Sequence, residues 1–253
     1  MRRFTRCMVS SMRLYGQAMV DYLHGQMGKL VIERDDGRRE ANDISSLFAS
    51  HSGKHSRWRE DERMAIRFAR GRVLDVGCGP GRVALYLQRR GISVTAIDIS
   101  PEALQVARTR GVKKTLLMDA RHLSFPPKSF DTFITFGHNF GICGDFSATR
   151  RFLKDLARVA RPRARLIAST RTPGSWIPRH APYVMKNVRD GRPPGLIRLR
   201  LEYKGKKGSW FPLLLLSPDD AMRLCLSAGW EVVRVVPCGG GIEDYSFVAE
   251  WSD

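Results

Sequence analysis

Residues 73–82, Val73-Leu74-Asp75-Val76-Gly77-Cys78-Gly79-Pro80-Gly81-Arg82, combine an apolar run of strand length with three glycines at alternate positions. Glycine has no Cβ, so the backbone here can turn sharply and approach a ligand closely, while the N–H groups that open the following helix can donate to its polar end. The pattern predicts a nucleotide-type cofactor site at a strand-to-helix turn. Taken alone, it also fits a tight connection in any α/β protein, so the residues around it must decide.

The glycine spacing distinguishes between classes of cofactor. Dinucleotide sites follow G-x-G-x-x-G, and their third glycine lets the helix pack closely against the strand. Here Gly77, Gly79 and Gly81 follow G-x-G-x-G, and Arg82 stands where that third glycine would fall. We expect the arginine to crowd helix and strand apart, which disfavours a nicotinamide dinucleotide.

An acidic residue follows the second predicted strand, residues 93–97. Asp98 lies about 20 residues beyond the glycines, where a carboxylate can accept hydrogen bonds from both ribose hydroxyls of a nucleoside. Ser100, Pro101 and Glu102 then supply a cap, a first-turn proline and a first-turn acid for the next helix. The alternative is that Asp98 is a loop carboxylate or an acid at a helix start.

Together, Asp75 and the three glycines resemble motif I of the class I S-adenosylmethionine-dependent methyltransferases, in which a hydrophobic strand and an acidic residue precede G-x-G-x-G. The resemblance is specific over residues 73–169. It implies that the cofactor is S-adenosyl-L-methionine and the product S-adenosyl-L-homocysteine, with Asp119 receiving the adenine amino group and the backbone at Ala120 meeting a ring nitrogen. The cofactor-binding residues that it implies are Asp75, Gly77, Cys78, Gly79, Gly81, Asp98, Ile99, Asp119, Ala120 and Phe136.

The segment after the fourth predicted strand, residues 136–141, is where the family resemblance directs the methyl group. Methyl transfer from a sulfonium is an in-line displacement on an activated donor, so the protein mainly aligns the acceptor and excludes water. His138 and Asn139 are the candidate catalytic residues. His138 could serve as a base where the acceptor must lose a proton, or it could hydrogen-bond backbone or cofactor. Residues 135–140 lack the Asn/Asp-Pro-Pro-aromatic motif of DNA amino-methyltransferases, which disfavours exocyclic base amines.

The alternation of strand and helix patterns predicts an α/β protein. The resemblance implies a three-layer α/β/α sandwich whose seven-stranded, mostly parallel sheet has the order 3-2-1-4-5-7-6, with strand 7 antiparallel. We expect a methyltransferase domain over residues 73–253. Between strands 5 and 6 it would carry a substrate-cap insertion, residues 170–217, with a hairpin formed by residues 196–203 and 210–216.

Residues 1–72 are expected to form a mainly helical extension, or lid, interrupted by a polar stretch at residues 33–43. In related methyltransferases such a segment covers the cofactor and shapes the substrate pocket. Its aromatic and histidine side chains are candidates for lining that pocket, or they pack the helices onto the core. These candidates are Tyr15, Tyr22, Phe48, His55 and Trp58.

The composition of the 253 residues, 43% hydrophobic and 27% charged, is typical of a soluble globular protein. No apolar stretch approaches the roughly 20 residues that span a bilayer, so no membrane association is predicted. The five cysteines are odd in number and lack C-x-x-C spacing, which favours reduced thiols in the cytoplasm. No cysteine and histidine cluster has metal-ligand spacing, so no metal is predicted.

The net charge of +18 favours an anionic partner such as nucleic acid. The basic residues are spread along the chain, however, and no recognised nucleic-acid-binding module is present. We therefore expect a small-molecule acceptor methylated on O, N or C. RNA or protein methylation comes second, and a cofactor-binding protein without activity stays open; the oligomeric state is not predicted. The local basic clusters are residues 38–39, 113–114, 158–165 and 204–207.

Overall fold

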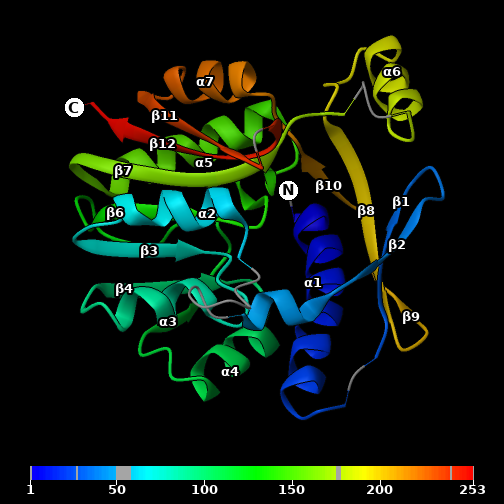
Figure 1. The fold of residues 1–253 in the computed structure, drawn as a ribbon, viewed down its shortest axis with the longest axis horizontal. Coiled ribbons are helices and arrows are strands. Elements are labelled where there is room, and N and C mark those ends of the chain that lie inside the picture. The colour runs from blue at the N-terminus through cyan, green and yellow to red at the C-terminus, as the bar shows by residue number, and fades with distance from the viewer. Residues whose placement is uncertain (1, 27, 50–57, 175–177, 240, 253) are drawn as a thin grey trace. The chain divides into compact units, whose positions relative to one another are not determined.

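The computed structural model describes residues 2–26, 28–49, 58–174, 178–239 and 241–252 (Figure 1). Its helices are α1 (Arg2–Leu23), α2 (Glu60–Ala65), α3 (Arg82–Gln88), α4 (Pro101–Thr109), α5 (Phe146–Val159), α6 (Ala181–Arg189) and α7 (Pro218–Leu226), with the 3-10 turns η1 (Ile44–Phe48), η2 (Ile66–Phe68) and η3 (Asn139–Gly141). Its strands are β1 (Leu30–Arg34), β2 (Arg39–Asn42), β3 (Arg72–Val76), β4 (Ser93–Asp98), β5 (Thr115–Leu117), β6 (Phe130–Thr135), β7 (Ala160–Arg171), β8 (Leu196–Tyr203), β9 (Lys206–Lys207), β10 (Phe211–Leu214), β11 (Trp230–Cys238) and β12 (Gly241–Trp251).

The chain forms two compact units, each assembled from three segments. The first unit comprises Met1–Trp58, Leu74–Ala120 and Arg198–Phe211. The second comprises Arg59–Val73, Arg121–Ile197 and Pro212–Asp253. Segments far apart in the sequence are therefore packed together in both units.

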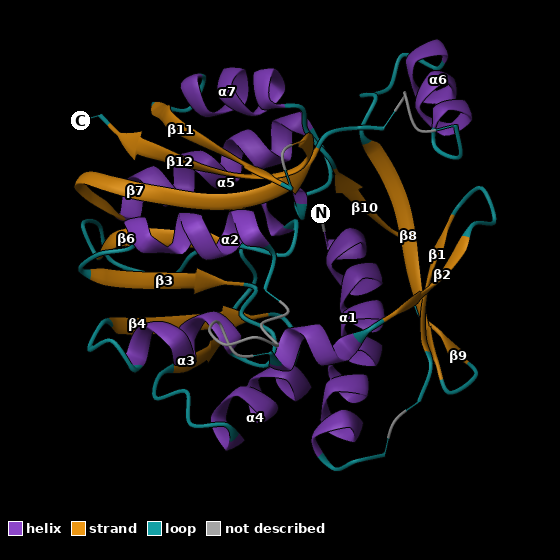
Figure 2. Cartoon of the chain, in the orientation of Figure 1, coloured by secondary structure: helices purple, strands orange, loops and turns teal. Residues whose placement is uncertain are grey.

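A seven-stranded sheet has the order β11-β12-β7-β6-β3-β4-β5 (Figure 2). The pairs β4–β5 and β6–β7 are parallel, whereas β12 runs antiparallel to both β7 and β11. This arrangement confirms the predicted order 3-2-1-4-5-7-6 with an antiparallel seventh strand. The central strands β3 and β6 are almost entirely buried, which explains their continuous apolar runs in the sequence.

The helices that follow the strands begin at side-chain caps. Ser100, Asp145 and Ser217 each accept a hydrogen bond from the backbone N–H three residues later, at Ala103, Ala148 and Asp220. Such caps satisfy donors that the helix itself leaves unpaired. The predicted start of α4 at Ser100 is therefore confirmed.

A second sheet has the order β10-β8-β1-β2, with β9 also paired to β8. It contains the predicted hairpin of the insertion, but the expectation of a mainly helical N-terminal segment is wrong for β1 and β2. β2 was not predicted because it carries Arg39, Glu40 and Asn42 in place of apolar side chains, and in β1 the apolar run is only three residues long before Glu33 and Arg34. Arg200 Nη2 donates to Glu33 Oε1 at 2.7 Å, and Arg39 Nη2 donates to Glu202 Oε2 at 2.7 Å.

Within the first unit, α1 is fastened to the β8–β9 hairpin and to the residues after it. Asp21 accepts hydrogen bonds from the Tyr203 hydroxyl at 2.9 Å and from Lys204 Nζ at 2.5 Å. Burial alone would raise the pKa of Asp21, but these donors outweigh it and the pKa is lowered. Nearer the start of α1, Ser11 Oγ donates to the carbonyl oxygen of Ser209 at 2.8 Å. The N-terminal helix and part of the insertion therefore form one structure.

In the described part of the chain, no helix combines the length and apolar character needed to cross a membrane.

We expect Gly141→Ala to destabilise the protein by about 3 kcal/mol, because overpacking a tight backbone contact forces the chain to shift. A Cβ at Gly141 would lie 1.7 Å from the carbonyl oxygen of Leu214. Gly191→Ala is the matched control: its backbone has φ +67° but nothing within 4 Å of the added Cβ, so it should lose only about 1 kcal/mol from backbone strain. Urea unfolding measures both, and equal losses would contradict the packing argument.

Candidate functional site

The glycine turn after β3 has a left-handed backbone at Gly77, Gly79 and Gly81, with φ of 71°, 52° and 80°. The N–H groups of Gly77 and Cys78 donate to the Ile97 carbonyl oxygen at 2.9 and 3.0 Å, and Gly81 N donates to the Cys78 carbonyl oxygen at 3.0 Å. These donors are used within the chain. The turn offers a ligand close approach, since a Cβ on Gly79 would meet, among the described residues, only the Met19 side chain, at 3.7 Å.

Gly81, at the start of α3, has no room for a side chain. A Cβ there would lie 2.4 Å from Val112 Cγ2, so the α3 start packs tightly against the chain after α4. The Arg82 guanidinium lies over the Trp58 ring, 4.5 Å from the centroid. The expectation that Arg82 crowds helix and strand apart stays a prediction.

Asp98 joins the glycine turn to the end of β4. Its Oδ2 accepts a hydrogen bond from Gly79 N at 2.9 Å and its Oδ1 accepts one from Ser100 N at 2.9 Å. Burial raises the pKa of Asp98 while these N–H donors oppose the rise. A carboxylate oxygen can accept more than one hydrogen bond, so both atoms keep acceptor capacity for ligand hydroxyls.

The next strand end brings a second acid alongside Asp98. Met118 N donates to the Asp98 carbonyl oxygen at 3.0 Å, so Asp119 and Ala120 follow directly beyond β5. Ile99, Asp119 and Ala120 are all half-buried. The first unit thus brings together the acids that the sequence placed at successive strand ends.

Helix α1 lies against this part of the first unit. A Cβ on Gly16 would come within 2.2 Å of Ser100 Oγ, which shows how closely α1 approaches the start of α4. Directly before Gly16 in the sequence, the Tyr15 side chain hydrogen-bonds Asn42 and is influenced by the charges of Arg82 and Asp98. Burial raises the pKa of the Tyr15 hydroxyl. Of the aromatic candidates, Tyr15 is therefore the one that the structure brings near Asp98.

The other aromatic candidates pack against each other and against neighbouring side chains. The Tyr22 and Phe48 ring centroids are 4.5 Å apart, and Trp58 Nε1 donates to the Ala49 carbonyl oxygen at 3.0 Å. These contacts agree with the packing alternative for these three residues. His55 lies outside the described residues.

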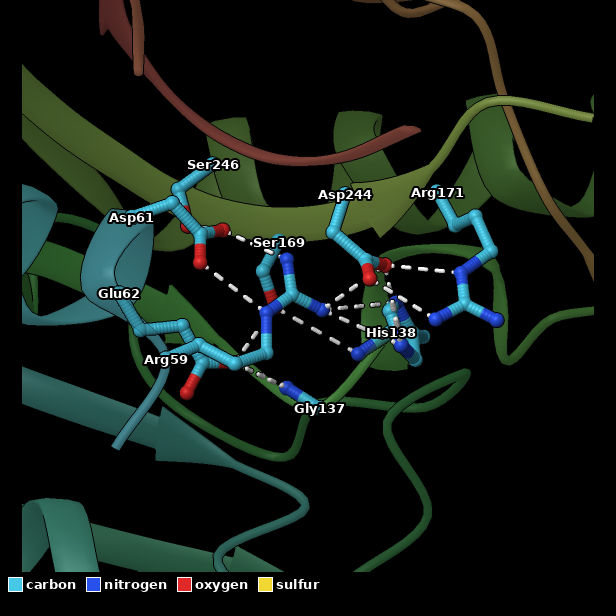
Figure 3. Close-up of polar contacts among 9 residues, drawn as sticks. All are labelled: Arg59, Asp61, Glu62, Gly137, His138, Ser169, Arg171, Asp244 and Ser246. Atoms are coloured by element: carbon cyan, nitrogen blue, oxygen red, sulfur yellow. Dashed lines mark hydrogen bonds and ion pairs between the residues drawn. The ribbon is translucent and has the colours of Figure 1, made fainter. Parts of the chain in front are cut away.

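In the second unit, Phe136 is buried beyond the end of β6, and the chain then turns through two consecutive left-handed residues (Figure 3). Gly137 has φ 69° and His138 has φ 66°. Asn139, half-buried, closes the turn by donating its N–H to the Phe136 carbonyl oxygen at 3.4 Å. A non-glycine residue in this conformation is uncommon, so the loop needs support from its surroundings.

That support comes from Glu62 of α2, which is only 1% exposed. Its Oε1 accepts hydrogen bonds from Gly137 N and from Ser169 Oγ, both at 2.9 Å. A buried carboxylate that accepts such bonds holds its donors firmly, because the carboxylate itself has no water as an alternative partner. Glu62 therefore fixes the loop that carries His138.

Arg59 links two carboxylates beside the same loop (Figure 3). Its Nη2 donates to Asp61 Oδ2 at 2.6 Å and its Nη1 to Asp244 Oδ1 at 3.3 Å. Asp61 also accepts from Ser246 Oγ at 2.7 Å, while Arg171 binds both oxygens of Asp244 at 2.8 Å. The two guanidiniums are thus held in place by acids.

His138 faces this pair of guanidiniums. Arg59 Nη1 lies 3.4 Å from its Nδ1 and 3.2 Å from its Nε2. An atom nearly equidistant from both ring nitrogens lies over the ring face, because in the ring plane it would collide with Cε1. Burial and the Arg59 charge lower the pKa of His138 to about 4, although Asp244 and Glu62 act in the opposite direction.

These surroundings determine what His138 can do chemically. At neutral pH its imidazole is uncharged, with one ring nitrogen as donor and the other as acceptor. A general base works best when its pKa lies near the working pH, so His138 is a weak proton acceptor. The geometry favours the hydrogen-bonding alternative over the base.

No group of side chains within the described residues has the composition and spacing to hold a metal ion. Cys78 is buried within the glycine turn, and burial raises the pKa of its thiol well above the ordinary value. An inert thiol of this kind agrees with a role as a small spacer.

The sequence did not indicate Arg59, Glu62, Arg171 or Asp244 as site residues. Each is an ordinary charged residue in its local sequence, and they meet only because α2 and the ends of β7 and β12 converge in the second unit. The one local signal is the run of acids at residues 60–62, in the first turn of α2.

Comparisons with known proteins agree with this architecture. Residues 74–168 match a family profile described as a methyltransferase domain. The demethylmenaquinone methyltransferase of Tropheryma whipplei is 40% identical over 99 residues, which is 38% of this chain and 39% of that protein. The malonyl-[acyl-carrier protein] O-methyltransferase of Salmonella typhimurium is 39% identical over 106 residues, 41% of this chain and 40% of that protein. The chain thus spans about two fifths of the length of these relatives.

Among solved structures, a SAM-dependent methyltransferase from Bacteroides fragilis, in complex with S-adenosyl-L-homocysteine, has the same fold. Its TM-score is 0.80 at 24% identity, covering 96% of this chain and 97% of that chain.

We expect His138 to titrate near pH 4 rather than near 6.5, as followed by NMR of labelled histidine and assigned with His138→Gln. Replacing Arg59 or Arg171 by Gln removes a positive charge that faces the ring, so either variant should raise the pKa of His138. The folded state binds the His138 proton less readily than the unfolded state. The contribution of His138 to the free energy of unfolding is therefore fully present above pH 6.5 and falls as the pH drops toward 4. A resonance of His138 that titrates near 6.5 in the unaltered protein would contradict the stacked geometry.

Proposed function

Since residues 74–168 form a class I S-adenosylmethionine-dependent methyltransferase domain, we propose that this protein transfers a methyl group from S-adenosyl-L-methionine to an O, N or C nucleophile of a small molecule. The observation that carries the proposal is the bond from Gly79 N to Asp98 Oδ2. This bond holds the Asp98 carboxylate against the glycine turn. The carboxylate can bind ribose hydroxyls, and a ligand can approach the turn closely.

The residues of the first unit fit such a donor molecule. Among the described residues, a Cβ added to Gly79 would meet only Met19. Both carboxylate oxygens of Asp98 keep acceptor capacity. When bound, S-adenosyl-L-methionine supplies an activated methyl group on a sulfonium, leaving S-adenosyl-L-homocysteine. Asp98 would accept from the ribose hydroxyls and Asp119 from the adenine amino group, with the Ala120 backbone on the ring. The remaining proposed contacts in the first unit are Asp75, Gly77, Cys78, Gly81 and Ile99.

We propose that His138 and Asn139 align the methyl acceptor. The loop that carries them is fixed by Glu62, and the uncharged imidazole of His138 can donate or accept one hydrogen bond. Alignment is the main requirement of an in-line displacement on an activated carbon. The acceptor that suits this loop is a nucleophile that presents a lone pair without first giving a proton to the protein.

Two relatives support the proposal of a small-molecule acceptor. One is named a demethylmenaquinone methyltransferase and the other a malonyl-[acyl-carrier protein] O-methyltransferase. The free cysteines among the described residues, Cys78, Cys143, Cys225 and Cys238, suit a reducing compartment, and we place the reaction in the cytoplasm.

Isothermal titration calorimetry should show binding of S-adenosyl-L-methionine and S-adenosyl-L-homocysteine but not of NADH. Asp98→Ala should weaken both affinities at least about tenfold, because charge-assisted hydrogen bonds are lost. Asp36→Asn, which removes a carboxylate from the β1–β2 turn of the same unit, is the control and should leave them unchanged. Binding of NADH instead, or an unaltered affinity in Asp98→Ala, would refute the assignment.

Incubation with methyl-labelled S-adenosyl-L-methionine and a cell extract tests the acceptor class. After separation into small molecules, RNA and protein, we expect the label in the small-molecule fraction, and a matched loss of label with Asp98→Ala. Label in RNA or protein would contradict the small-molecule acceptor while leaving methyl transfer intact.

A further inference from the structure

Away from the loop that carries His138, the second unit gathers cations where β3, β6 and β7 begin. We call this group the basic surface. Every member is exposed, and the members come from the approach to β3, the loop before β6 and the junction of α5 with β7. The basic surface consists of Arg70, Arg72, Lys128, Arg158, Arg161 and Arg163.

The guanidiniums of the basic surface are held by neutral backbone oxygens. Arg70 Nη2 donates to the Arg163 carbonyl oxygen at 2.8 Å. Arg72 Nη2 and Arg161 Nε both donate to the Lys128 carbonyl oxygen, each at 3.2 Å. A carbonyl oxygen orients a guanidinium but does not cancel its charge. The side chains are therefore positioned close together with their positive charge intact.

Carboxylates neutralise only part of this charge. Asp155 pairs with Arg158 at 2.8 Å, and Asp131 lies 3.7 Å from Arg161. Among the residues that the structure describes, no carboxylate forms an ion pair with the side chain of Arg70, Arg72, Lys128 or Arg163. Asp131 Oδ2 accepts a hydrogen bond from the Arg72 backbone N–H at 2.8 Å. Like charges at this spacing repel each other unless an anion lies between them.

The backbone beneath the basic surface is held in an unfavourable conformation at two places. Lys128 has φ 55° and Arg163 has φ 59°, a region that costs a non-glycine residue roughly 1–2 kcal/mol. The same two residues supply the carbonyl oxygens that hold the three guanidiniums. Strain retained at cationic residues that also orient other cations indicates a functional surface.

The basic surface is separate from the proposed methyl-transfer site. Lys128 precedes β6 and His138 follows it, and the strand comprises 6 residues. At about 3.3 Å per residue, the two ends of β6 lie roughly 20 Å apart. A ligand at the basic surface would therefore not occupy the acceptor site.

We propose that the basic surface binds the phosphodiester backbone of nucleic acid. Guanidiniums match phosphate oxygens with paired donors, and several cations at fixed positions suit a ligand that repeats its charge along a chain. The net charge of +18 adds long-range attraction for a polyanion. An anionic membrane is the less suitable partner, because the exposed large hydrophobic side chains of the described residues lie outside residues 124–129 and 160–164.

The test measures fluorescence anisotropy of labelled short duplexes, one of DNA and one of RNA, between 50 and 200 mM salt. The main variant is Lys128→Asn with Arg163→Asn, since asparagine tolerates positive φ and both charges are removed. Its control is Lys186→Gln with Arg189→Gln, which removes the same charge from exposed positions of α6. We expect the main variant to weaken binding about tenfold and to reduce the slope of log K against log salt by about 2, and the control to change affinity less than twofold.

Arg70→Gln is a second variant at a residue with ordinary φ, and it should weaken binding in the same direction. Comparable weakening by main variant and control would show that only total charge matters and would overturn the proposal. Failure of the unaltered protein to bind either duplex, or binding instead to vesicles of anionic phospholipid with the same dependence on Lys128 and Arg163, would also overturn it. The two duplexes distinguish DNA from RNA as the source of the backbone. Methyl transfer does not enter the measurement, so its outcome is independent of the proposed activity.

Discussion

Both units depend on a carboxylate that holds the N–H of a left-handed glycine just beyond a strand. In the first unit Asp98 binds Gly79, and in the second Glu62 binds Gly137. A chain that leaves a strand through positive φ exposes backbone donors, and a carboxylate from another element satisfies them at a fixed position. Asp98 thereby sets the shape of the glycine turn, and Glu62 sets the shape of the loop that presents His138. The catalytic proposal requires both loops to be rigid.

The features that could be predicted from the sequence depend on residues that lie close together in the chain. The glycine turn, Asp98 and the caps of the following helices lie within one βαβ pattern, and the sheet order follows from the resemblance. The site roles of Arg59, Glu62 and Asp244 could not be predicted, because these roles depend on contacts between residues as far as 185 positions apart. The β1–β2 hairpin was missed for a different reason. β2 carries almost no apolar side chains, and β1 is stabilised in part by an ion pair with another strand, Glu33 with Arg200 of β8, which no local pattern predicts.

The charge arrangement around His138 shapes the kind of chemistry the loop can support. Two guanidiniums beside an imidazole oppose its protonation, and two acids, Asp61 and Asp244, keep those guanidiniums in place. The result is an orienting group that keeps one protonation state across the neutral range. A loop built in this way suits a reaction whose driving force is already present in the donor, where geometry matters more than proton transfer.

The fastening of α1 to the insertion links two parts of the chain that would otherwise vary separately. Asp21 is joined to Tyr203 and Lys204, and Ser11 to Ser209, so a changed hairpin needs a compatible helix almost 200 residues earlier. Insertions of this kind could not be exchanged between related enzymes as single cassettes. An engineer who transplants the hairpin to alter acceptor choice would have to carry α1 with it, and with α1 the Tyr15 and Met19 side chains that lie near Asp98 and Gly79. The insertion hairpin and the helix that lies near Asp98 would therefore be inherited together.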